Sequence, residues 1–181
     1  MSRIGKKSIL LNQNVQVDIK DQVCIVKGQK GTLQRKLPCN VELIKRGPEL
    51  FIIPVDLDTV KKRRLHGLLR TLINNMVIGV SIGFSKKLEI HGVGYKAHIA
   101  DQHLVLTLGY SHVIKFLPPE GVSLLVENNN IVLVKGIDKE KVGLASACIR
   151  SIKPPEVYKG KGIRYAGELV RRKLGKASKN Q

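Results

Sequence analysis

The feature that most constrains the fold of this 181-residue chain is an internal repeat. A displacement of 81 positions superposes turn and strand residues, namely Gly28 on Gly109, Pro38 on Pro119, Val41 on Val122 and Leu43 on Leu124. A displacement of 76 superposes a later set, Gly67 on Gly143, Leu69 on Ala145, Leu72 on Cys148, Ile73 on Ile149 and Met76 on Ile152. The difference between the two displacements fits a shorter connection in the second copy. We therefore predict a duplicated unit, since self-similarity at a fixed spacing is typical of repeated structure.

Each copy begins with short strands and ends with a helix. In the first copy, alternating apolar residues and turn residues predict strands over 15–19, 23–26, 32–37, 41–44 and 50–53. An amphipathic stripe then follows, made of Leu65, Leu68, Leu69, Leu72, Ile73 and Met76. Asp58 or Thr59 is expected to cap this helix, and Gly79 to end it.

The second copy repeats this order. Strands are predicted over 88–90, 95–99, 103–108, 113–116, 122–126 and 131–134, with turns at Asp101-Gln102 and over 127–130. A helix capped by Asp138 runs to Ile152, with Ala145, Cys148 and Ile149 on its apolar side. The sequence thus predicts an α+β fold of two tandem duplicated small domains, each an antiparallel sheet covered by one helix. Residues 1–82 form the first, with a basic N-terminal arm, and residues 83–181 the second, with a basic C-terminal tail.

The charge of the chain limits its partners. There are 32 Lys and Arg against 14 Asp and Glu, a formal net charge of +18. Such an excess favours a polyanionic partner, with nucleic acid the commonest and an anionic membrane the alternative. A generic basic surface is the plainer interpretation. The apolar runs are too short for a transmembrane helix and the N-terminus lacks a secretory signal pattern, so we expect no membrane partner.

Several catalytic and cofactor patterns are incomplete. Gly92-Val93-Gly94 lacks the last glycine of a dinucleotide fingerprint, and Gly160-Lys161-Gly162 lacks the Ser or Thr of a phosphate-binding loop. The histidines have no ligand-like spacing, and Cys24, Cys39 and Cys148 are isolated, so buried and reduced thiols are expected. We predict no catalytic residue, no metal, no cofactor and no small-molecule substrate.

Glycine-rich, basic and aromatic segments remain as candidates for RNA contact. Glycine permits close approach of a sugar-phosphate chain, Lys and Arg neutralise phosphate, and tyrosine offers a face for stacking. The candidates are Gly92, Gly94, Tyr95 and Lys96; Tyr110, Ser111 and His112; and Tyr158, Lys159, Gly160, Lys161, Gly162, Arg164 and Tyr165. Tyr95 and Tyr110 could equally pack on the core. The third segment favours RNA contact because it is too charged for a core.

Two basic ends extend this set. The C-terminal part contributes Lys153, Arg171, Arg172, Lys173 and Lys176, and the N-terminal arm contributes Arg3, Lys6 and Lys7. For the arm, RNA contact and a solvated chain end are equally compatible with the sequence.

Six segments carry a resemblance to a known family. They are 1–7 (MSRIGKK), 65–77 (LHGLLRTLINNMV), 92–96 (GVGYK), 108–112 (LGYSH), 135–139 (KGIDK) and, most specific, 155–165 (PEVYKGKGIRY). In this order they resemble large-subunit ribosomal protein six of the bacterial type. The resemblance implies a structural, non-enzymatic protein that binds large-subunit ribosomal RNA mainly through its second domain. It further implies neighbouring large-subunit proteins and a position near the stalk base and the region contacted by translational GTPases.

The chain departs from the family pattern at three positions. Ser8, Val113 and Val157 stand where proline is frequent, which affects local loop shape but removes no charge. These residues, with Asn128 to Asn130 and scattered cysteines, favour a plastid ribosome slightly over one in a bacterial cytoplasm. A free-standing RNA-binding regulator or RNA chaperone is the competing function.

Overall fold

The computed structural model describes residues 2–20, 22–38, 41–54 and 60–173. The predicted cap at Asp58 or Thr59, Cys39 and the RNA candidate Lys176 lie outside these ranges. The chain divides into two compact units. The first comprises Met1–Phe84 with Ile137–Lys139, and the second comprises Ser85–Gly136 with Glu140–Gln181.

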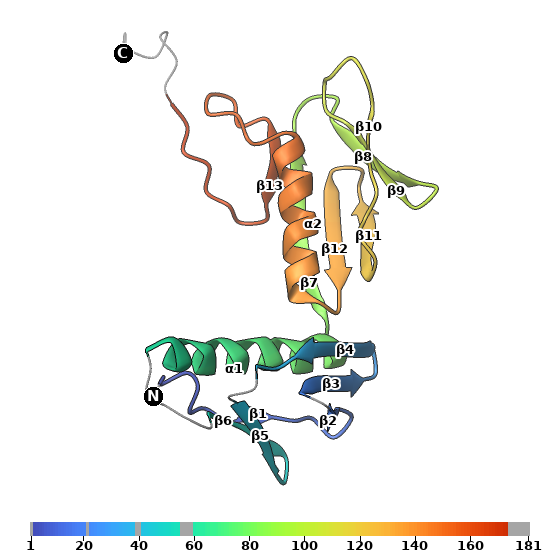
Figure 1. Cartoon of the computed structure of the whole chain (residues 1–181). Helices are drawn as coiled ribbons and strands as arrows, with labels where there is room; N and C mark the ends of the chain where they lie inside the picture. Colours follow the sequence, from blue (N-terminus) through green and yellow to red (C-terminus); the bar gives the residue numbers. More distant parts are fainter. Residues whose placement is uncertain (1, 21, 39–40, 55–59, 174–181) are drawn as a thin grey trace. The chain divides into compact units, whose positions relative to one another are not determined.

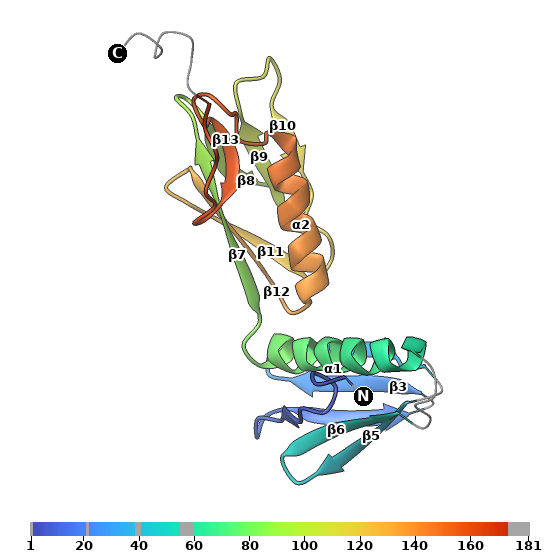
Figure 2. The same ribbon diagram turned by 90° about the vertical axis from the view of Figure 1, so that its left-hand side faces the viewer.

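The first unit contains two small sheets and a helix. Its elements are β1 (Ile9–Leu10), β2 (Gln16–Lys20), β3 (Val23–Gly28), β4 (Gly31–Lys36), β5 (Val41–Arg46), β6 (Glu49–Pro54) and α1 (Val60–Ser81). One sheet has the order β2-β3-β4 and the other β1-β6-β5, and neighbouring strands in both are antiparallel. Helix α1 lies along β3 (Figures 1 and 2) and also contacts β4 and β6.

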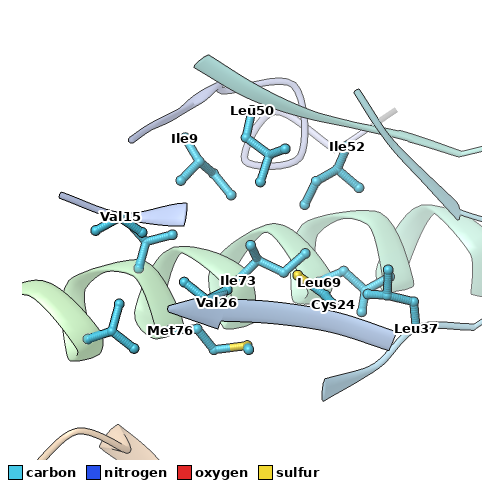
Figure 3. Packing of buried hydrophobic residues seen from close by; sticks show 12 residues of the cluster. Ile9, Val15, Cys24, Val26, Leu37, Leu50, Ile52, Leu69, Ile73 and Met76 are labelled. Atoms are coloured by element: carbon cyan, nitrogen blue, oxygen red, sulfur yellow. The ribbon is translucent and has the colours of Figure 1, made fainter. Parts of the chain in front are cut away.

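One apolar cluster joins these sheets to the helix. The buried side chains come from β1, β3, β6 and α1 and include Ile9, Val26, Leu50 and Ile73 (Figure 3). Cys24 is fully buried among them, and this burial raises the pKa of its thiol to about 11. Cys24 is therefore a neutral core residue at physiological pH.

The second unit repeats this plan with one strand more. Its elements are β7 (Phe84–His91), β8 (Lys96–Ala100), β9 (His103–Thr107), β10 (Ile114–Phe116), β11 (Val122–Glu127), β12 (Ile131–Gly136), α2 (Lys139–Ile152) and β13 (Gly162–Tyr165). The sheets have the orders β10-β9-β8 and β11-β12-β7-β13. Helix α2 runs along the sheet that contains β12, as Figures 1 and 2 show.

The two units share their topology, which confirms the predicted α+β duplication. The meander β2-β3-β4 corresponds to β8-β9-β10, and the hairpin β5-β6 corresponds to β11-β12. Strand β1 beside β6 corresponds to β7 beside β12. The sequence did not predict β1, because two residues carry no periodicity. Strand β13 has no counterpart among the described residues of the first unit.

The polar turns of the second unit form where they were predicted. Asp101 and Gln102 have φ of 47° and 66°, and Asn128 and Asn129 have 52° and 58°. Asn and Asp tolerate this left-handed region better than most residues, which explains why such residues connect these strands.

The predicted end of the first helix is wrong. Helix α1 continues past Gly79 to Ser81, and Val80 near its end is fully buried. The left-handed residue that ends it is Gly83, with φ of 82°, whose N–H donates to the Ile78 carbonyl at 3.1 Å. Helices commonly end at a residue in this conformation, and Gly79 does not adopt it.

The apolar stripes also differ in detail from prediction. In α2 the buried positions are Val142, Ala145, Ser146 and Ile149, whereas Cys148 is exposed. The expectation of a buried Cys148 is therefore wrong, because the buried stripe lies on the side of Val142 and Ser146. In α1, Leu68 is likewise exposed.

The N-terminal arm is docked on α1. An added Cβ at Gly5 would lie 2.5 Å from the ring of His66, so the arm passes directly over this buried histidine. Arg70 donates to the carbonyls of Lys7 and Ser8 at 3.3 and 3.0 Å. The backbone of the arm is therefore held in place, and this part of the chain is not a loose end.

Candidate RNA interface

The segment after α2 is a folded hairpin that belongs to the second unit. Ile163 N–H donates to the Lys153 carbonyl at 2.8 Å, and Glu156 N–H donates to the Lys161 carbonyl at 2.8 Å. Gly160 N–H donates to the Glu156 carbonyl at 3.0 Å, closing the tip. We call residues 153–163 the C-terminal hairpin.

The second arm of the hairpin enters the sheet as β13. This strand pairs antiparallel with β7, with Ile163 opposite Ile90 and Arg164 opposite Glu89. Ile163 is fully buried. The expectation that the charge of this segment excludes it from a core is therefore wrong for β13, where Gly162 and Ile163 are buried and Arg164 is the one cation.

The two glycines of the hairpin are needed for close approach within the protein itself. An added Cβ at Gly162, where φ is 137°, would lie 2.5 Å from the Pro154 carbonyl oxygen. At Gly160, where φ is 70°, it would meet the Arg172 guanidinium at 2.9 Å. Lys173 N–H also donates to the Val157 carbonyl at 2.8 Å. The chain beyond β13 therefore returns to the hairpin and places Arg172 beside its tip.

An ion pair and hydrogen bonds hold the residues after β13 against α2. Arg150 donates to both carboxylate oxygens of Glu168, from Nε at 3.0 Å and from Nη2 at 2.5 Å. Glu168 also accepts the backbone N–H of Tyr165 at 3.0 Å. Lys86 Nζ lies 4.9 Å and the Arg150 guanidinium carbon 5.7 Å from the centroid of the Tyr165 ring. Tyr165, a candidate for RNA stacking, is thus surrounded by intramolecular cation–π contacts.

The Arg150–Glu168 pair predicts a pH-dependent contribution to stability. Hydrogen bonds from Arg150, and then from the Tyr165 backbone, lower the pKa of Glu168. Because the pKa of Glu168 is lower in the folded state, the ion pair stabilises the fold at pH values above the ordinary pKa of glutamate. This contribution disappears as the pH falls through the folded-state pKa. Glu168→Gln should therefore cost about 0.5–1 kcal/mol at neutral pH, since the pair is partly solvated, and progressively less in acid.

Urea denaturation at neutral and acidic pH measures this difference. Tyrosine fluorescence reports on the second unit, because the chain has no Trp and Tyr95, Tyr110, Tyr158 and Tyr165 all belong to that unit. Glu127→Gln, at an exposed strand end, is the matched control. A Glu168→Gln deficit that grows in acid would contradict the assignment.

The candidate loop 92–96 divides into a packed part and an exposed part. The ring of Tyr95 fills the space beside Gly92 and Gly109, where added Cβ atoms would lie 2.5 and 3.0 Å from it. Tyr95 therefore supports the loop that carries Tyr110. Gly94 and Lys96 are exposed, as is Val93 at 91%. Gly109 was not among the predicted site residues, and its role follows only from this packing.

Tyr110 and His112, from the loop between β9 and β10, meet Lys153, which follows α2. Tyr110 O–H donates to the carbonyl of Ile152, the last residue of α2, at 3.1 Å. Its ring stacks with His112 at a centroid separation of 5.9 Å and an interplanar angle of 21°. Lys153 Nζ lies 4.1 Å from the Tyr110 centroid. All three were predicted as site residues, but Lys153 was assigned to the C-terminal tail and no contact with Tyr110 was predicted.

The remaining predicted residues differ in their solvent exposure and in their contacts within the protein. Exposed residues of the second unit are Ser111, Tyr158, Lys159, Arg171, Arg172 and Lys173. Lys161 is partly buried, and Arg164 is engaged by Glu89 at 3.7 Å and His91 at 3.5 Å. Arg3, Lys6 and Lys7 are exposed on the first unit. The exposed groups offer cations for phosphate and flat rings for bases, while Arg164 and Tyr165 mainly hold the hairpin in place.

Other chemistry finds little support in the described part of the chain. Residues 2–20, 22–38, 41–54 and 60–173 contain no group of three or more His, Cys, Asp and Glu placed to hold a metal ion. Neither helix there is long and apolar enough to cross a membrane.

Comparison with known proteins decides the family. A family described as Ribosomal protein L6 matches residues 12–83 and 91–166, one stretch in each unit. The chain belongs to the ribosomal protein L6 family. The two matches fall on the duplicated parts, so the L6 repeat and the structural repeat coincide.

Relatives in the L6 family match over nearly their whole length. The chain is 53% identical over 179 residues to large ribosomal subunit protein uL6 of Nostoc sp., covering 99% of this chain and 98% of the relative. It is 52% identical over 183 residues to large ribosomal subunit protein uL6c of Pyropia yezoensis, covering 100% of both. These L6 relatives are named as ribosomal proteins and not as enzymes, in agreement with the sequence-based prediction.

Proposed function

We propose that this chain is a structural protein of the large ribosomal subunit that binds large-subunit ribosomal RNA, mainly through its second unit. The observation that carries the proposal is the folded C-terminal hairpin, which presents Tyr158 and Lys159 with Arg171, Arg172 and Lys173 beside it. A network of backbone hydrogen bonds holds the chain that carries these groups before RNA arrives. Preorganised cations lose less conformational entropy on binding than a free tail would.

The domain division follows from the same reasoning. We take residues 1–82 and 83–181 as the two functional domains. All four tyrosines and the C-terminal hairpin then fall in the second, which supports a larger share of RNA affinity there. Arg3, Lys6 and Lys7 project from the docked arm and give the first domain a smaller cationic surface.

The family implies a more specific location. Its members named large ribosomal subunit protein uL6 or uL6c include cyanobacterial and plastid proteins, so we place this chain in a ribosome of a bacterial cytoplasm or a plastid. We further place it near the stalk base and the factor-binding region, among other large-subunit proteins and close to bound translational GTPases. The net charge of +18 suits burial among RNA phosphates.

Sedimentation with large ribosomal subunits tests the proposal. A structural protein should remain with the subunit through a high-salt wash, because buried contacts are screened less than exposed ones. Crosslinks from the second unit should then map to nucleotides at the stalk base. Release by the wash together with messenger RNA would instead identify a free-standing regulator or chaperone. Retention with crosslinks elsewhere would refute only the location.

A further inference from the structure

The loop between β9 and β10 is anchored at two points. The Tyr95 ring packs against Gly109, whose φ is 72°. The Tyr110 hydroxyl donates to the Ile152 carbonyl at the end of α2. A terminal helix carbonyl lacks an intrahelical partner, so this hydrogen bond satisfies a group that would otherwise need water. Tyr110 is thereby fixed against the helix.

Lys153 adds a third anchor. Its backbone carbonyl accepts Ile163 N–H in the C-terminal hairpin, and its ammonium group lies 4.1 Å from the Tyr110 centroid. A cation over an aromatic face is attracted by the ring quadrupole. Because an ammonium group has three donors, Lys153 can keep this contact and still donate to a phosphate.

His112 is the second ring of this arrangement, stacked on Tyr110. It is exposed, and its stacking geometry on Tyr110 lies within the range of favourable offset pairs. Tyr110 is 39% exposed, but its hydroxyl donates to Ile152 and its ring already contacts His112 and the Lys153 ammonium group. The flat surface left for a further ring is therefore the face of His112 turned away from Tyr110.

We propose that this outer face of His112 stacks on an unpaired nucleobase of the bound RNA, with Tyr110 and Lys153 as positioning residues. The inference rests on the proposed RNA-binding function and names the residue that contacts a base. RNA is recognised most often through unstacked bases that stack on aromatic side chains, including histidine. A stack of base, His112 and Tyr110, with Lys153 able to reach the adjoining phosphate, fits one nucleotide of a single-stranded loop.

Filter binding of the full chain to a transcript of large-subunit ribosomal RNA tests this assignment. His112→Ala should raise Kd by about 5- to 150-fold, the range for loss of one stacked base. His112→Phe should restore binding to within about threefold of wild type, because the ring and not its charge makes the contact. The dependence of log Kd on log salt should keep its slope in both variants, since no phosphate contact is removed.

Two further variants separate stacking from other causes. His98→Ala changes an exposed histidine on β8 of the same unit and should bind as wild type does. Tyr110→Phe removes the hydroxyl that donates to Ile152 and should weaken binding less than His112→Ala. Melting temperatures of all variants confirm that each is folded.

The outcomes separate the stacking of His112 on a base from the RNA-binding function itself. Wild-type affinity in His112→Ala would overturn the stacking assignment while leaving RNA binding intact. Equal losses in His112→Ala and His112→Phe would also overturn it, since the contact would then need imidazole nitrogen. Failure of the wild-type chain itself to bind the transcript would overturn the proposed function, and this inference with it.

Discussion

An alanine at Gly162 should lower the free energy of unfolding of the second unit by about 2–5 kcal/mol. Two costs combine there. The φ of 137° is rarely adopted by residues with a side chain, and the added methyl group would lie 2.5 Å from the Pro154 carbonyl oxygen. Backbone atoms cannot move aside as a flexible side chain can, so β13 must shift away from β7. RNA affinity should fall together with stability, because the hairpin holds the exposed cations in place.

Gly143→Ala is the matched control for this change. Gly143 lies inside α2, and an added Cβ there would meet nothing within 4 Å. Alanine favours a helix interior over glycine by up to about 1 kcal/mol, so this variant should equal or exceed wild type in stability. Urea denaturation followed by tyrosine fluorescence compares the two variants. Coincident unfolding curves would show that β13 is not held as the structure indicates.

Sequence periodicity predicted most of the fold because the elements are long enough to display it. The stripe from Leu65 to Met76 lies inside α1, and the polar turns at Asp101 and Asn128 join the expected strands. The duplication was visible because glycine and proline recur at turns under one fixed displacement. Strand β1 has only two residues and is too short to display periodicity.

The errors come from residues whose role depends on tertiary contacts. Gly79 was predicted to end the helix by its identity, but the left-handed conformation belongs to Gly83. Cys148 was assigned to the buried side from its spacing, whereas Ser146 occupies that side. Composition alone could not show that Ile163 is a core residue in a strongly basic segment.

The candidate site was predicted residue by residue but not in its arrangement. The sequence marked Tyr110 and His112 as one segment and Lys153 as part of the C-terminal tail, and the fold brings the three side chains into one cluster. It also marked Tyr165 and Arg164 for RNA, whereas Arg150, Glu168 and Glu89 engage them within the protein. No local pattern distinguishes a lysine that binds phosphate from an arginine that holds a hairpin.

The second large effect concerns the exposed cations of the C-terminal region. Replacing Lys159, Arg171 and Lys173 together with alanine should weaken binding to large-subunit ribosomal RNA by at least about tenfold. The slope of log Kd against log salt should fall in magnitude by about two to three. Each phosphate contact releases counterions when it forms, so the loss of three contacts leaves fewer counterions to be released. All three side chains are exposed, so the fold should be unaffected.

A triple variant of the first unit provides the control for net charge. Lys20, Lys36 and Lys45 are also exposed, and their replacement with alanine removes the same three charges. If only general electrostatic attraction held the RNA, the two triple variants would bind it with equal affinity. A defined interface in the second unit makes their affinities differ. Binding of the first-unit variant should stay within about threefold of wild type, with its salt slope nearly unchanged.

A salt titration of RNA binding by wild type and these two triple variants tests most directly whether the second unit carries the RNA interface. We predict a flatter slope and weaker binding only for the Lys159, Arg171 and Lys173 variant. Equal slopes for the two variants, or a flatter slope for the Lys20, Lys36 and Lys45 variant alone, would contradict this assignment.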